Sequence, residues 1–282
     1  MISRQSLAVG LHRGRTELRQ TARTPREYLG HLTNPAMFLV TASFQTGNIP
    51  GSPVASSRLV IAGSVAALLA MIAMVWLPQQ LATEREDGTL LRLRGTPGGM
   101  TAYLVAKTLM VLVIAGLSTA LLLVAGALTT DSGFPGSAER WCTLLWVTAL
   151  GLVALSLLGA AIGALLPNPR QALAWVMIPI LGLLFISGIF YPVTSMPQWL
   201  RITGEVFPLK WIAQGIRSAL LPDSALVAET GHSWQHWQTF GVLGAWTLLG
   251  LLLAPRLLLK SSRRESGSRL AARRERVGQR SY

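Results

Sequence analysis

Four long runs of apolar residues without any charged side chain limit what this chain can fold into more than any other feature. The clearest run is Leu59 to Leu81, whose 23 residues would extend roughly 35 Å as a helix. That length suits the hydrocarbon core of a bilayer, where a charge at the centre would cost about 2.5–3.5 kcal/mol. The other runs are Thr108–Thr130, Trp141–Leu166 and Gln171–Tyr191. We therefore predict an all-α integral membrane protein.

Two further segments bring the predicted number of transmembrane helices to six. Trp237 to Leu259 is the last, and the first is the short apolar segment Pro35 to Phe44, which a turn-rich loop follows. Between spans five and six, Pro192 to His236 alternates short apolar pieces with prolines. Irregular backbone at membrane depth has to be shielded by protein, so we predict short re-entrant helices in the outer leaflet here.

The distribution of positive charge predicts the orientation. Six alternating spans put 19 of the 25 lysines and arginines on one side of the membrane and four on the other. The first group lies in 1–34, 82–101, 167–171 and 256–282, and the second in 47–57, 129–140 and 192–236. Because cytoplasmic flanks carry the excess of Lys and Arg, we predict that both termini are cytoplasmic.

Three regions follow from this pattern. Residues 1–34 mix leucines with arginines and predict an amphipathic helix along the inner membrane surface, with a disordered basic arm as the alternative. Residues 35–259 form the transmembrane domain, and 260–282 a basic cytoplasmic tail. The net charge of +13 gathers at the two ends of the chain, which favours membrane flanks over a nucleic-acid partner.

The sequence lacks the groups that an enzyme or a self-energised pump would use. No cluster of titratable residues predicts a catalytic site, and we expect no metal site, since His232 and His236 have only Glu229 nearby. None of the lysines follows the glycines of a phosphate-binding loop. No predicted span carries a central carboxylate, which proton-coupled transporters usually need. The energy source is therefore expected outside this chain.

One stretch gathers charge between two apolar runs. Residues 84–94 hold six charged side chains in eleven residues, with acids at the front and arginines at the back. That order suits the dipole of a short helix, which Gly88 would interrupt and Gly95 would end. We interpret it as a helix that docks into a groove of a cytoplasmic ATPase; a solvated loop is the alternative.

Two motifs in this chain resemble those of ABC-2 type permeases. The stretch from Glu84 to Pro97, followed by Tyr103-Leu104-Val105-Ala106-Lys107, is similar to the first cytoplasmic loop of that family. The second match is Ser187-Gly188-Ile189-Phe190-Tyr191-Pro192 with the Met196–Leu200 and Phe207–Leu209 segments after it. The resemblance covers about residues 30 to 260 and is nearest to the daunorubicin-resistance type. The short first span departs from the pattern.

The resemblance implies the permease subunit of an exporter in the bacterial inner membrane. Two copies of a separate ATPase would carry ATP and Mg²⁺, and a second permease chain would complete a homodimer or heterodimer. The implied substrate is a hydrophobic or amphiphilic compound such as a drug, an antibiotic or a lipid. The alternatives are a membrane scaffold without a transport cycle and a proton-driven efflux pump.

The resemblance also implies two sets of site residues. The ATPase-coupling set is Glu84, Arg85, Glu86, Asp87, Gly88, Thr89, Leu90, Leu91, Arg92 and Arg94. A substrate path at the dimer interface would be lined by Phe38, Phe44, Met71, Met74, Phe185 and Phe190. For each member of the second set, ordinary packing in the core or against lipid is the alternative.

Overall fold

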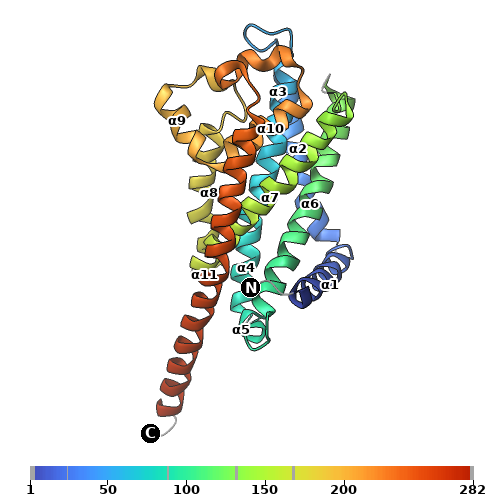
Figure 1. Ribbon diagram of the computed structural model, residues 1–282. Coiled ribbons are helices and arrows are strands. Elements are labelled where there is room, and N and C mark those ends of the chain that lie inside the picture. The colour runs from blue at the N-terminus through green and yellow to red at the C-terminus, as the bar shows by residue number, and fades with distance from the viewer. Residues whose placement is uncertain (1–3, 24, 88, 131–132, 167–168, 280–282) are drawn as a thin grey trace.

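Eleven α-helices make up most of the part of the chain that the structure describes (Figure 1). This computed structural model describes the backbone of residues 4–23, 25–87, 89–130, 133–166 and 169–279. Side chains are described in the same ranges except at 25–32, 86, 91, 94, 169–175 and 261–279. Over these ranges the β-pairing is a single bridge between Asn48 and Ala55. The prediction of an all-helical chain is confirmed for the described residues.

The most deeply buried helix is continuous from Ser56 into the charged stretch. It consists of α3 (Ser56–Ala70), a π-helical segment η1 (Met71–Trp76) and α4 (Leu77–Glu86). A π segment accommodates a surplus residue by i→i+5 hydrogen bonds and often marks a functional site. Gly159 of the neighbouring helix packs against it so closely that a Cβ there would lie 2.0 Å from the Ala73 carbonyl oxygen. The helix predicted over Leu59–Leu81 is confirmed, and Ser56–Arg85 is long and apolar enough to cross a membrane. The π segment is an addition to the prediction.

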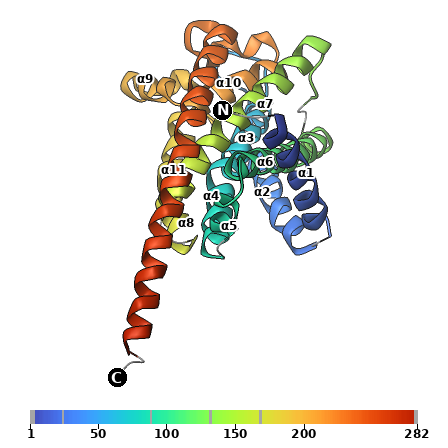
Figure 2. The same ribbon diagram turned by 60° about the horizontal axis from the view of Figure 1, so that its bottom comes forward.

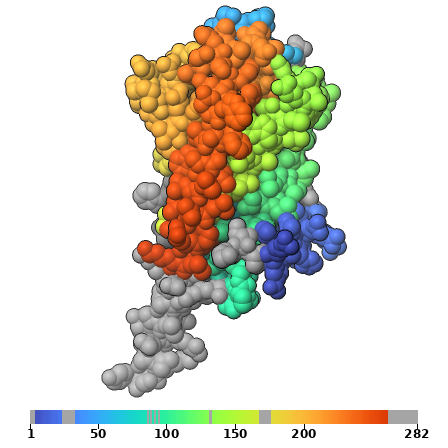
Figure 3. Space-filling model, viewed as in Figure 1, coloured from blue at the N-terminus to red at the C-terminus, as the bar shows by residue number. Residues whose placement is uncertain are grey.

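Three other helices are long and apolar enough to cross a membrane. They are α6 (Gly99–Thr129), α7 (Ala138–Leu165) and the first part of α11 (His236–Gln279). The helix α6 begins nine residues before the predicted run and so includes Lys107. The helix α11 continues without a break into the predicted tail, and it forms much of the face seen in Figure 3.

The remaining two predicted spans correspond to shorter helices. The helices α2 (Pro25–Ser43) and α8 (Pro169–Ile186) have 19 and 18 residues and contain Pro35 and Pro179. The first half of α2 is polar, which lowers the mean hydropathy of that helix. In α8 the apolar helical segment among the described residues is Val176–Ile186. Six membrane crossings remain a prediction. The predicted regional boundary at 34/35 falls inside α2, and that at 259/260 falls inside α11.

The long helices alternate in direction, so the two ends of the bundle are different. In Figure 1 α1 (Arg4–Thr21), α5 (Thr89–Arg94) and the C-terminal part of α11 lie toward the bottom, which we call the lower end. The upper end carries α9 (Gln198–Val206), α10 (Pro208–Leu220) and the short 3₁₀ segments η2 (Val193–Ser195), η3 (Asp223–Ala228) and η4 (Thr230–His232). Short helices are thus found where the prolines predicted them; their depth in a membrane stays a prediction.

A buried ion pair holds the upper end together. Arg217 of α10 is 1% exposed and Glu229 is 2% exposed. The guanidinium donates two hydrogen bonds to the Glu229 carboxylate, one of them 3.1 Å long, and a third of 2.9 Å to the Gly188 carbonyl just after α8. Because these partners satisfy both charges, the pair can remain buried, and it joins α8, α10 and the 3₁₀ segments.

Candidate functional site

The charged stretch folds as two short helical pieces at the lower end of the bundle. The helix α4 ends at Glu86, Asp87 follows it as the C-terminal cap, and α5 occupies Thr89–Arg94. Leu90 is buried and Arg92 is exposed. One side of α5 therefore packs on the bundle, and the other side faces outward. The predicted short helix is therefore divided in two; Gly88, predicted to interrupt it, lies outside the described residues.

Arg85 points inward instead of toward solvent. Its side chain is 7% exposed and donates one hydrogen bond of 3.3 Å to the carbonyl of Ala164 and another to the carbonyl of Leu166. These two residues lie at the C-terminal end of α7, where backbone carbonyls lack helical partners and the helix dipole favours a cation. Arg85 therefore ties the end of α4 to the end of α7.

Glu84 belongs to a second network, which we call the basal charge cluster: Arg13, Glu17, Glu84, Tyr103 and Lys107. The Lys107 ammonium of α6 is hydrogen-bonded to the Glu84 carboxylate of α4 and, at 2.8 Å, to the Glu17 carboxylate of α1. Arg13 donates to Glu17 at 2.7 Å and lies 5.3 Å from the centre of the Tyr103 ring. Two cations and two anions thus balance, and the cluster connects three helices.

The charge environment of Glu17 is strong enough to overcome its desolvation. Burial alone would raise the pKa of its carboxyl, but Lys107 and Arg13 outweigh that effect and hold the pKa below its usual value. Because the pKa is lowered, the interaction of the Glu17 carboxylate with Lys107 and Arg13 stabilises the fold fully at any pH above the ordinary glutamate pKa. This contribution is lost as the pH falls through the lowered pKa, when the carboxylate takes up a proton.

The N-terminal helix α1 docks on α6 through its smallest residues. Ser6, Gly10 and Gly14 are buried in that contact, and a Cβ on Gly10 would lie 2.7 Å from the Ala102 carbonyl oxygen. Leu7 and Leu11 of α1 remain exposed. Arg4–Thr21 is thus helical and not a disordered arm, and its place on the inner membrane surface stays a prediction. Figure 2 shows α1 beside the lower end of α6.

Substituting Gly10 by valine is expected to separate α1 from α6. The backbone of α6 cannot move aside for a branched side chain, and overpacking of a tight contact typically costs about 1–3 kcal/mol. We would measure trypsin cleavage after Arg13 and Arg15, expecting faster cleavage in the variant. Ala8→Val is the matched control, because Ala8 is exposed on the same helix. Equal cleavage of both variants would contradict the close packing.

The predicted coupling residues therefore divide into two groups. Glu84, Arg85 and Leu90 anchor the stretch to the bundle, while Asp87 and Arg92 are exposed and Thr89 is half-buried. The side chains of Glu86, Gly88, Leu91 and Arg94 lie outside the described residues. Sequence reasoning gave no role to Lys107 or Glu17; a signal was present in Tyr103 and Lys107, which share one helix face next to the charged stretch.

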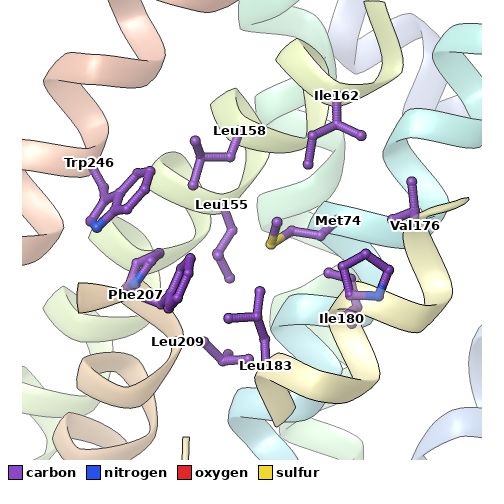
Figure 4. A pocket seen from close by; sticks show the side chains of 12 residues that line it. Met74, Leu155, Leu158, Ile162, Val176, Ile180, Leu183, Phe207, Leu209 and Trp246 are labelled. Atoms are coloured by element: carbon purple, nitrogen blue, oxygen red, sulfur yellow. The ribbon is translucent and has the colours of Figure 1, made fainter. Parts of the chain in front are cut away.

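An apolar pocket lies higher in the bundle, beside the π-helical segment. Its volume is about 370 Å³, and Met74, α7, α8, the start of α10 and Trp246 of α11 enclose it. In Figure 4 Leu155, Leu158 and Leu183 project into the space between Met74 and Trp246. The Trp246 indole N–H already donates to the Val206 carbonyl at 2.9 Å. The pocket therefore offers carbon surface and suits an apolar group of moderate size.

The structure does not bring the six predicted path residues into one lining. Phe38 and Phe190 stack with ring centres 6.0 Å apart, and Phe38 is 5% exposed. Phe44 and Phe185 are 80% and 63% exposed, as expected of an interface or a lipid-facing surface. Met74 lines the pocket, and Met71 is half-buried in the same π segment.

Comparison with known proteins finds a family of membrane transporters and two relatives that are similar to this chain. Residues 14–221 match the family model described as ABC-2 type transporter. The chain is also similar to the "Probable multidrug ABC transporter permease YbhR" of Escherichia coli strains K12 and O157:H7, with 27% identity over 166 residues in each case. The aligned region covers 57% of this chain and 44% of each relative.

Proposed function

Because this chain belongs to the ABC-2 type transporter family, we propose that it is the permease subunit of an ATP-driven exporter. The permease would pair with a second permease chain and with two copies of a separate ATPase, which bind ATP and Mg²⁺. The substrate would be a hydrophobic or amphiphilic compound, such as a drug, an antibiotic or a lipid. The name of the E. coli relatives, a probable multidrug permease, supports this substrate class.

The proposed topology has six spans and both termini in the cytoplasm. The excess of Lys and Arg in the segments that lie at the lower end supports this orientation. It makes the lower end cytoplasmic and places α9 and α10 toward the outer leaflet. The apolar helices and the family together indicate a multi-pass membrane protein, and we assign it to the bacterial inner membrane.

The observation that carries the proposal is the way the charged stretch is fixed to the spans. Asp87 and Arg92 are exposed for a partner, whereas Arg85 and Glu84 tie the same stretch to α7 and, through Lys107, to α6 and α1. A pull on α5 by a closing ATPase dimer would therefore reach three helices at once. ATP binding would in this way favour one of two arrangements of the spans.

The pocket beside the π segment would hold an apolar part of the substrate inside each protomer. Met74 lines it and lies in the same continuous helix that ends in the coupling stretch, eleven residues before Arg85. A change in the π segment would therefore alter both the pocket and the orientation of α4. This arrangement gives substrate occupancy a direct route to the ATPase contact.

Charge reversal at the two exposed coupling residues is expected to weaken ATPase binding about tenfold or more, since like charges would then face the partner. The variant is Asp87→Arg with Arg92→Glu, and the measurement is co-purification of the ATPase encoded beside this chain, with substrate-stimulated ATP hydrolysis. The control is Glu139→Lys, which reverses an exposed charge at the upper end. Unchanged ATPase binding would contradict the docking role, and no associated ATPase at all would favour the scaffold.

A further inference from the structure

A second cavity lies at the lower end, where α1, α6, α7 and α11 meet. Its volume is about 540 Å³, and leucines from all four helices line it: Leu11, Leu104, Leu109, Leu157, Leu251 and Leu252. It opens on the side of the bundle at the level of α1. Figure 3 shows α11, α6 and α1 side by side along this face. The cavity is therefore an open groove between α1, α6, α7 and α11.

One charged side chain stands at the edge of this apolar groove. Arg256 of α11 is among the lining residues, is exposed, and makes a 3.4 Å hydrogen bond to the carbonyl of Leu252 one turn earlier. The hydroxyls of Thr101 and Thr108 provide further polar groups. Among the described lining residues there is no carboxylate to neutralise the guanidinium.

Two more cations follow along the helices that form the groove. Lys260 is exposed one turn below Arg256 on α11, and Arg15 is exposed one turn after Leu11 on α1. Residues four apart share a helix face, so each cation lies on the same helix face as a residue that lines the groove. The groove is thus apolar inside and has cations near its edge.

We propose that this groove binds an anionic phospholipid of the cytoplasmic leaflet. One acyl chain would lie between α6, α7 and α11, and the phosphate would accept hydrogen bonds from the Arg256 guanidinium, which suits phosphate geometry. Basic pockets between transmembrane helices on the cytoplasmic side recognise anionic headgroups in this way. The inference rests on the proposed topology, because only that topology puts the lower end in the cytoplasmic leaflet.

A bound lipid would have a structural effect on α1. Leu11 is both part of the groove lining and part of α1, whose other contacts are the small-residue face and the basal charge cluster. A lipid in the groove would therefore fasten the N-terminal helix to α11 as well as to α6. Loss of anionic lipid would leave the α6 contact as the main attachment.

The test uses the purified chain in detergent, with lipid added back and the melting temperature measured. Dioleoyl phosphatidylglycerol is expected to raise the melting temperature saturably, whereas dioleoyl phosphatidylcholine and inorganic phosphate each leave it nearly unchanged. Arg256→Ala should weaken the phosphatidylglycerol response about tenfold, as expected from loss of a charge-assisted phosphate contact. Arg201→Ala, at the upper end, is the charge-matched control.

A second variant separates the groove from the charge. Leu252→Trp would fill the groove without changing the charge, and Leu248→Trp, one turn away and also exposed, is its control. An equal response to the two lipids, or no effect of Arg256→Ala and Leu252→Trp, would overturn the proposal in favour of nonspecific lipid contact. A full response to phosphate alone would overturn it in favour of a simple anion site. Neither measurement needs the ATPase, so failure of the exporter proposal would be seen separately.

Discussion

Replacing Arg217 by methionine is expected to lower the free energy of unfolding by about 3–5 kcal/mol, the usual cost of removing one partner of a buried ion pair. The Glu229 carboxylate, 2% exposed, would remain in the interior without its counter-charge, and the Gly188 carbonyl would lose its donor. The measurement is thermal unfolding of the purified chain in detergent. We expect the largest fall in melting temperature of any single substitution discussed here.

Two comparisons make the Arg217 result specific. Arg201→Met removes the same charge from a half-exposed position at the same end and should change stability by about 0.5 kcal/mol or less. Adding Glu229→Gln to Arg217→Met should recover part of the loss, because the buried carboxylate is then neutral. If the double variant is less stable than Arg217→Met alone, the ion pair is not the origin of the effect.

Lys107→Met is expected to cost about 3 kcal/mol and to release the N-terminal helix. The substitution nearly keeps the length and packing of the side chain, but it leaves the Glu84 carboxylate without its cation and the Glu17 carboxylate with Arg13 alone. Hydrogen bonds between charged groups typically contribute about 1.5–3 kcal/mol each, and two are lost. Melting temperature reports the stability, and tryptic cleavage after Arg13 and Arg15 reports the release of α1.

The same substitution is also expected to disconnect the coupling stretch from α6. In a complex with the ATPase, Lys107→Met should reduce substrate-stimulated ATP hydrolysis while ATPase binding is retained, because Asp87 and Arg92 are unchanged. Arg201→Met is the control, since it removes a half-exposed cation at the upper end, outside both the cluster and the groove. Neutralising both acids in the Lys107→Met background, with Glu17→Gln and Glu84→Gln, should restore stability. Normal coupling in Lys107→Met would show that the cluster has no role in transmission.

The transmembrane helices could be predicted because their signal does not depend on partners. A run such as Leu59 to Leu81 is predicted as a span from its length and lack of charge alone, and the structure has an apolar helix there that is long enough to cross a membrane. The first span illustrates the opposite case. Its apolar part is short, and the structure extends the helix backward through Pro35 to Pro25, where the composition alone gives little support.

The charged networks could not be predicted, because their members are far apart in the sequence. Lys107 binds Glu17 across 90 residues, and Arg85 reaches the Leu166 carbonyl across 81. Local pattern explains why α5 forms but contains no information on which acid a lysine will meet. The resemblance assigned Glu84 and Arg85 to the ATPase contact, and the structure shows that both side chains also have partners within the chain.

The π-helical segment at Met71–Trp76 has a genetic consequence. In an ordinary α-helix, deletion of one codon turns everything below it by about 100°. Within α6, for example, a one-residue deletion after Lys107 would rotate Lys107 by about 100° relative to the rest of the helix. Lys107 and the later part of α6 could then no longer both face their present partners. A π turn already holds one residue more than an α turn, so a one-codon deletion between 71 and 76 can be absorbed by conversion to α-helix. Arg85 would then still face the end of α7. A homologue could therefore have one residue fewer in this helix and keep the hydrogen bonds from Arg85 to the α7 carbonyls.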